Sequence, residues 1–86
     1  MKDSIVVNCK TKEEAIELFK YLIKKGYEWI NGDMLFIEDN DWIVCKEETC
    51  YHIHTKEKLI AYSQVFYYRS RGAEILTFQQ FKELIK

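Results

Sequence analysis

Residues 11–26 carry the signals for one amphipathic helix, and this helix limits the folds open to the chain more than any other feature. Thr11 can cap its first turn, and Glu14, three residues later, can reach back to complete a capping box. Gly26 is placed to end the helix in a left-handed conformation. The apolar stripe consists of Ala15, Ile16, Phe19, Leu22 and Ile23. The pattern predicts a helix over about residues 12–25 that must bury one face against another element.

Short β-branched or aromatic runs, separated by polar turns, make up most of the remaining chain. Residues 4–9 form a predicted strand before the helix, and Asn31-Gly32 after it is typical of a two-residue hairpin turn. The later predicted strands are residues 27–30, 33–38, 42–46, 51–55 and 59–68, with a short final strand at 73–76. The regular spacing of the turns predicts an antiparallel meander. A second capping box, Thr77 with Gln80, predicts a C-terminal helix.

Together these elements predict a single α+β domain over residues 1–86, in the order β-α-β-β-β-β-α. We expect two layers, an antiparallel sheet with the helices packed on one face and the other face partly solvated. The composition, 48% hydrophobic with no proline and three glycines, allows a modest core and indicates no flexible linker. No apolar run approaches the ~20 residues that span a bilayer, and residues 1–10 do not resemble a signal peptide. We therefore expect a cytoplasmic protein.

The chain resembles many small phage-encoded proteins at its start, VVNCKTKEEAIELFKYLIKKGYEWING. In those proteins a short strand leads into a Thr- or Ser-capped EEA helix and a Gly-Tyr-x-Trp stretch. The later segments TCYHI, KLIAYS and EILTFQQF are similar in kind, so the resemblance covers most of the chain. It implies an accessory phage protein, and some of these block bacterial defences, including anti-CRISPR proteins and sponges for nucleotide signals. The motifs are structural, and no catalytic residue is carried over from them.

Cys50, His52 and His54 lie at alternate positions of a predicted strand, so their side chains share one face. Cys45, on a neighbouring strand, would be a fourth candidate ligand for zinc. Same-face neighbours in a strand are roughly 7 Å apart, and one ion with bonds of ~2 Å can take two of them but hardly three. We therefore predict no metal site and interpret these residues as part of a polar outer face of the sheet.

Residues 28–48 are strongly acidic, although the whole chain has a net charge of only −1. This segment holds seven carboxylates against the single cation Lys46, a local charge of −6. The simpler interpretation is that these acids are solvated turn residues. The functional interpretation is a negative patch that docks onto a basic protein groove, where complementary charge speeds and orients association. The candidate binding residues are Glu38, Asp39, Asp41, Glu47 and Glu48.

The stretch of residues 63–72, SQVFYYRSRG, places three aromatic residues before two arginines. In a strand, Phe66 and Tyr68 would share a face, and either that pair or the residues alternating with it would be partly exposed. Arg69 and Arg71 beside exposed aromatics would suit a stacked base and a phosphate, or a protein interface. The simpler interpretation is a half-buried strand whose arginines reach solvent. We favour binding for the two arginines, with protein ahead of nucleotide because the chain is not basic overall.

These features indicate binding and not catalysis. The sequence contains no glycine-rich phosphate loop and no nucleophile-elbow serine, and we predict no catalytic residue and no cofactor. The predicted function is that of a small phage-type protein that inhibits a host protein, such as a defence nuclease, by direct contact. The alternative is an oligomeric ligand-binding module that sequesters a nucleotide signal. The sequence leaves the oligomeric state open.

Overall fold

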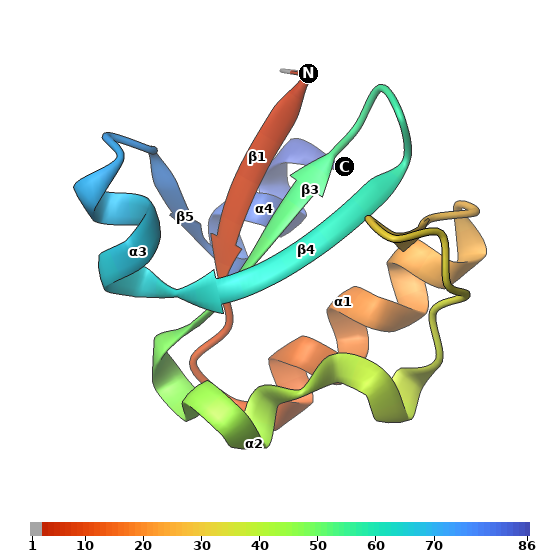
Figure 1. Cartoon of the computed structure of the whole chain (residues 1–86), viewed down its shortest axis with the longest axis horizontal. Coiled ribbons are helices and arrows are strands. Elements are labelled where there is room, and N and C mark those ends of the chain that lie inside the picture. Colours follow the sequence, from red (N-terminus) through yellow and green to blue (C-terminus); the bar gives the residue numbers. More distant parts are fainter. Residues whose placement is uncertain (1–2) are drawn as a thin grey trace.

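A five-stranded mixed sheet with helices on both faces forms the centre of the computed structural model, which describes residues 3–86 without the side chain of Asp39 (Figure 1). The strands are β1 (Ser4–Asn8), β2 (Glu28–Trp29), β3 (Thr49–His54), β4 (Leu59–Gln64) and β5 (Ile75–Thr77), in the order β2-β4-β3-β1-β5. β3 pairs antiparallel with β1 and β4, whereas β5 pairs parallel with β1 and β2 pairs parallel with β4. The α+β class is confirmed, but the purely antiparallel sheet is wrong. Both parallel pairs join strands that are far apart in the sequence. A meander contains no such pairs, because it joins each strand to the next one along the chain.

The first helix, α1 (Lys12–Lys24), forms as the sequence predicts. The Thr11 hydroxyl accepts a hydrogen bond from the Glu14 N–H at 3.1 Å, and the Glu14 carboxylate accepts one from the Lys10 N–H at 2.9 Å. The helix is therefore capped, although Glu14 reaches one residue further back than a capping box requires. Gly26, at φ +86°, follows the helix in the left-handed region. None of the described helices has the length and apolarity needed to cross a membrane.

The main core lies on one face of the sheet, beneath the two terminal helices, α1 and α4 (Phe78–Leu84). Side chains alternate along β3, so Tyr51 and Ile53 enter this core while Cys50 points to the other face. Other members include Leu18, Phe19, Leu22, Ile60, Phe78 and Phe81. Both helices predicted from capping signals therefore pack on one face, as expected, and the Thr77–Gln80 capping box is present.

A smaller core covers part of the opposite face, because residues 65–70 form a helix, α3 (Val65–Ser70), and not the end of a strand. Val65 and Tyr68, three residues apart, are buried on the sheet, while Phe66 is exposed. This spacing fits a helix, whereas a strand would place Phe66 and Tyr68 on the same face. The predicted strand therefore stops at Gln64, and the expectation that these two aromatics share a face is wrong.

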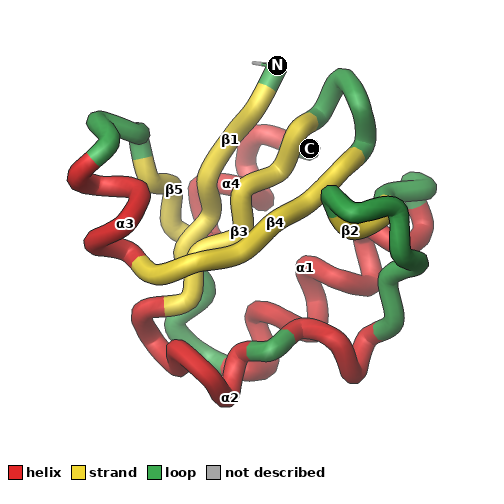
Figure 2. Tube along the Cα trace, viewed as in Figure 1, coloured by secondary structure: helices red, strands yellow, loops and turns green. Residues whose placement is uncertain are grey.

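Residues 30–48 form no strand, although the sequence predicts two there. They form a loop and three short helical turns, η1 (Ile37–Asn40), α2 (Trp42–Cys45) and η2 (Lys46–Glu48) (Figure 2). The chain turns back at residues 30–32, but the predicted two-residue Asn31-Gly32 turn is wrong, because Gly32 has a positive φ and Asn31 does not. The Trp29 N–H instead bonds to the Asp33 carbonyl at 2.8 Å around a three-residue loop. The returning chain makes one isolated bridge, Glu28 to Met34, and then leaves the sheet. Hydrogen bonds of the Asn40 side chain direct the chain into the helical turns. Its amide donates to the Ile37 carbonyl at 2.7 Å and accepts from the Trp42 N–H at 2.9 Å.

Candidate protein-binding surface

Side-chain hydrogen bonds fix the irregular segment of residues 30–48 to the rest of the molecule. The Tyr51 hydroxyl donates to the Asn40 carbonyl from within the core, and the Trp42 indole donates to the Cys9 carbonyl at 3.0 Å. Leu35, from the same segment, is buried in the main core. The segment therefore has a defined position, and so does the surface it presents.

The outer side of this segment exposes a concentration of large apolar side chains. Ile30, Met34, Phe36, Ile43 and Val44 are between 53% and 73% exposed. They account for half of the exposed large apolar side chains on the described chain. Single exposed apolar residues are normal on a protein surface, but a concentration of them marks an interaction site.

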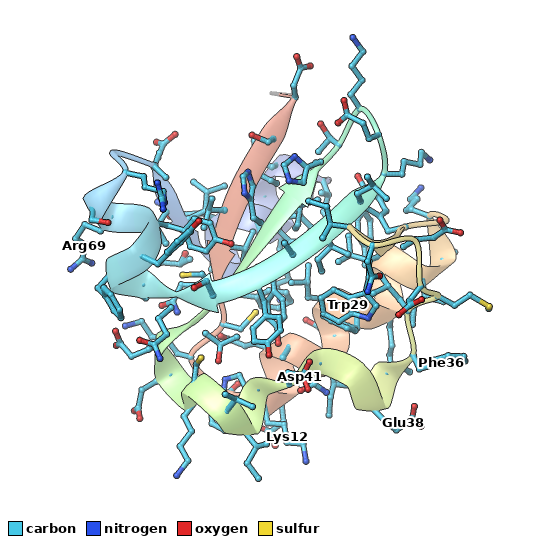
Figure 3. All side chains as sticks on the ribbon, in the orientation of Figure 1. Lys12, Trp29, Phe36, Glu38, Asp41 and Arg69 are labelled. Carbon is cyan, nitrogen blue, oxygen red and sulfur yellow. The ribbon has the colours of Figure 1, made fainter. Side chains whose placement is uncertain are left out.

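Two adjoining hollows lie on this surface and share Asp41 as a lining residue. The larger, a cleft of about 820 Å³, includes Trp29, Asp33, Met34, Phe36, Asp41 and Tyr62 in its lining. The smaller, of about 330 Å³, is lined in part by Lys12, Ile16, Glu38 and Ile43. Figure 3 shows Trp29, Phe36 and Glu38 on the right of the view, Asp41 near its lower centre and Arg69 on the left. We call the surface formed by Ile30, Met34, Phe36, Glu38, Asp41 and Ile43 the acidic-apolar surface.

The structure brings only part of the predicted acidic group to this surface. Glu38 is exposed there and Asp41 is half-buried, and Asp33 joins them in the wall of the larger cleft. The side chain of Asp39 lies outside the described part of the chain. Among the described side chains, no carboxylate of residues 28–48 forms an ion pair with a lysine or arginine. No described cation is therefore ion-paired with a carboxylate of this surface, although Lys12 lines the smaller hollow together with Glu38 and Asp41.

Glu47 and Glu48 form a separate acidic group in η2. Both are exposed, and Glu48 lines a small hollow that also includes Lys10 and Arg69. The Glu47 backbone carbonyl accepts a hydrogen bond from the Asn8 amide at 3.0 Å, which ties η2 to β1. The predicted acidic patch is therefore divided, with one part among exposed apolar residues and the other beside cations.

The predicted binding residues near α3 are divided between surface and interior. Phe66, Arg69 and Arg71 are exposed, and the Arg71 guanidinium lies over the Tyr67 ring at 4.3 Å from its centroid. Tyr68 is buried against the sheet, and burial raises the pKa of its hydroxyl to about 12. Phe66 and the two arginines remain available to a partner, whereas Tyr68 serves the smaller core.

The outer face of β3 places His52 and His54 side by side, with ring centroids 4.2 Å apart. Both are half-buried, and Cys50 is buried beneath α3. Burial, followed by the charge of Glu48, raises the pKa of the Cys50 thiol to about 11, so this thiol stays protonated at neutral pH. Within residues 3–86, apart from the Asp39 side chain, no group of three or more potential ligands is arranged to hold a metal ion.

Comparison with known proteins identifies no relative of this chain. No family model, curated protein or solved structure matches the chain.

The exposed apolar residues were not among the residues that the sequence singled out. Ile43 and Val44 fall in a predicted strand, and Met34 and Phe36 fall in the predicted hairpin. The signal that could have found them is their position in the most acidic part of the chain. Apolar residues interleaved with uncompensated acids suit a partner surface better than a core.

Proposed function

We propose that the protein binds another protein through the acidic-apolar surface and acts by that contact alone, without catalysis. The partner would present apolar side chains flanked by lysines or arginines. The observation that carries the proposal is the concentration of exposed apolar side chains on an anchored, acidic segment. Burying one side chain such as Phe36 contributes about 1.5–3 kcal/mol, and the surrounding carboxylates would steer a basic partner into place.

The resemblance to phage accessory proteins suggests which partner to look for. It favours a protein of the bacterial host, including a nuclease of a defence system, because such nucleases carry basic surfaces that hold nucleic acid. An acidic surface that occupied one would compete with the nucleic acid for the same cations. Inhibition by occupation needs no catalytic group on the inhibitor.

Sequestration of a nucleotide signal receives less support from the two larger clefts. The cleft of about 820 Å³ includes Asp33 and Asp41 among its lining residues, and a second cleft, of about 650 Å³ beside β1, includes Glu74 and Glu83. The described lining of neither cleft includes a lysine or an arginine. A phosphate group needs cations or converging N–H donors, so carboxylates in these positions would repel it.

The test is capture of proteins from a bacterial host lysate on three immobilised forms of the protein. These are the wild type, the double variant Phe36→Ser with Ile43→Ser, and Phe66→Ser as the matched control. The control removes an aromatic ring on α3 that is 67% exposed, against 53% for Phe36, and lies away from the acidic-apolar surface. We expect at least one protein that the wild type and Phe66→Ser retain and the double variant loses. A captured protein lost with Phe66→Ser and retained by the double variant would overturn the proposal.

A further inference from the structure

The cleft of about 820 Å³ has an aromatic wall that is fixed before any ligand binds. The Trp29 and Tyr62 rings meet edge to face, with centroids 6.0 Å apart. The buried ring of Phe19 holds Trp29 from the core side, with centroids 5.7 Å apart. Phe36, also in the lining, is more than half exposed. The faces of such rings carry negative electrostatic potential and attract a cation placed over them.

Two carboxylates, Asp33 and Asp41, line the same cleft, and its described lining includes no lysine, arginine or histidine. Asp33 accepts a hydrogen bond from the Asn31 amide at 3.2 Å through one oxygen, which leaves its other oxygen for a ligand. Asp41 interacts electrostatically with the aromatic wall. Burial is the larger cause of the raised pKa of the Tyr62 hydroxyl, and the charge of Asp41 is the next. The cleft therefore combines aromatic faces with two carboxylates and no cation in its described lining.

We propose that this cleft receives an arginine side chain of the partner, with its guanidinium stacked on the aromatic wall and hydrogen-bonded to Asp33 and Asp41. This inference rests on the proposed function and names the group that the acidic-apolar surface recognises. Arginine fits better than lysine for two reasons. Its planar guanidinium can stack on an aromatic ring while its edge donates to carboxylates, and it loses hydration more readily than an ammonium group.

The backbone at Asp41 allows a clean test. Asp41 has φ +55°, in the left-handed region, which asparagine adopts as readily as aspartate. Asp41→Asn therefore removes the charge without adding backbone strain, and Asp33→Asn removes the other. Glu38→Gln is the matched control, because it removes one charge from the same segment at a residue of the neighbouring hollow.

The experiment is a nuclear magnetic resonance titration of the protein with Nα-acetyl-arginine methylamide, followed at the two tryptophan indole N–H signals. We expect the Trp29 signal to shift saturably, while the Trp42 signal, whose N–H is bonded to the Cys9 carbonyl, stays in place. The citrulline analogue, which is neutral and nearly the same shape, should bind at least about fivefold more weakly. Asp33→Asn and Asp41→Asn should each weaken binding of the arginine probe about three- to fivefold, and Glu38→Gln should not.

Several results would overturn the inference. They are an unmoved Trp29 signal, equal binding of the citrulline probe, a Glu38→Gln effect as large as that of Asp41→Asn, and equal binding of the lysine analogue. The titration needs no partner, so it can fail while the capture experiment succeeds. In that case the arginine site is wrong and the proposed docking stands. If the probe binds but no captured protein depends on the acidic-apolar surface, the proposed docking, and with it the partner's arginine, is overturned.

Discussion

The sheet with its terminal helices and the segment of residues 30–48 are two regions of one small molecule that are held together in different ways. In the first region, β3 pairs along five residues with β1 and along six with β4. The helices α1 and α4 bury their apolar faces against one face of this sheet. In the second region there is no ladder of backbone hydrogen bonds between strands. Individual side chains, chiefly Tyr51, Trp42 and Asn40, hold it in place.

The two regions also differ in where they place their large apolar side chains. The sheet and terminal helices bury Phe19, Tyr51 and Phe81 almost completely. The segment buries Leu35 but leaves Phe36 and Ile43 largely exposed. Under the proposed function, the first region supplies stability and the second supplies the binding surface. Substitutions in the two regions should therefore have separable effects.

The largest effect on stability should come from Phe19→Ala in the first region. The ring is fully buried and meets Tyr51 edge to face, with centroids 5.2 Å apart. Its loss should lower the free energy of unfolding by about 3–5 kcal/mol, a large part of the total for a domain of this size. The measurement is urea denaturation followed by far-ultraviolet circular dichroism. A variant as stable as the wild type would show that α1 does not form the core described here.

Tyr51→Phe should have the next largest effect, because it cuts a connection between the two regions. The substitution keeps the buried ring but leaves the Asn40 carbonyl without its donor. We expect a loss of about 1–3 kcal/mol in urea denaturation, and faster amide hydrogen exchange in residues 37–48 than in β3. Tyr67→Phe, on an exposed ring, is the control and should change neither quantity. Uniformly faster exchange through both regions would mean that the segment is not a separate unit.

Acidification should weaken the first region through His52. Burial, followed by the neighbouring His54, lowers the pKa of His52 below its ordinary value of 6.5. Above pH 6.5 the imidazole is neutral in both the folded and the unfolded chain, so it contributes no pH dependence there. Below that value the unfolded chain takes up the proton first, and stability falls as the pH falls toward the folded-state pKa. Urea midpoints of the wild type should decline through this range, and those of His52→Gln should decline less. A midpoint that rises on acidification would contradict the assignment.

Phe36→Ser should leave stability unchanged while weakening binding. The side chain is 53% exposed, and substitutions at such positions usually change stability by less than about 0.5 kcal/mol. Thermal melting compares it with Phe66→Ser, and both should melt with the wild type. A clear loss of stability in Phe36→Ser would mean that the segment buries this ring in solution.

The smallest effect on binding should come from replacing Arg69 and Arg71 together with alanine. Of the two, Arg71 makes a described ring contact, with Tyr67. Such an exposed cation–π pair contributes at most about 1 kcal/mol to stability. Urea denaturation should show a change of that size or less. Binding to a captured partner should be retained, because Arg69 lies away from the acidic-apolar surface in Figure 3. Loss of binding would move the interface to α3, as the sequence alone first suggests.

The sequence predicts the helices of the first region and the alternation along β3 well, because these signals are local, but it does not predict the parallel pairs β1–β5 and β2–β4. Thr11 and Gly26 mark the ends of α1, Thr77 and Gln80 cap α4, and alternation separates Cys50 from Tyr51 in β3. Capping and alternation depend on neighbours along the chain, so they can be recognised without knowing the fold.

The second region and α3 could not be predicted in the same way. The apolar runs at residues 42–45 and 65–68 are too short to distinguish a strand from a helical turn by periodicity. Tertiary contacts decide each case, namely the Trp42 bond to the Cys9 carbonyl and the packing of Tyr68 on the sheet. The charge of the acidic segment marks the region of the candidate site. That Ile43 faces outward follows only from the fold.

The most direct test of separable regions is amide hydrogen exchange of the protein with and without its captured partner. We expect the partner to slow exchange in residues 30–45, which carry the acidic-apolar surface. Exchange in residues 65–72, which contain Phe66, Arg69 and Arg71, should be unchanged. Protection confined to residues 65–72, with none in residues 30–45, would contradict the account and place the interface on α3.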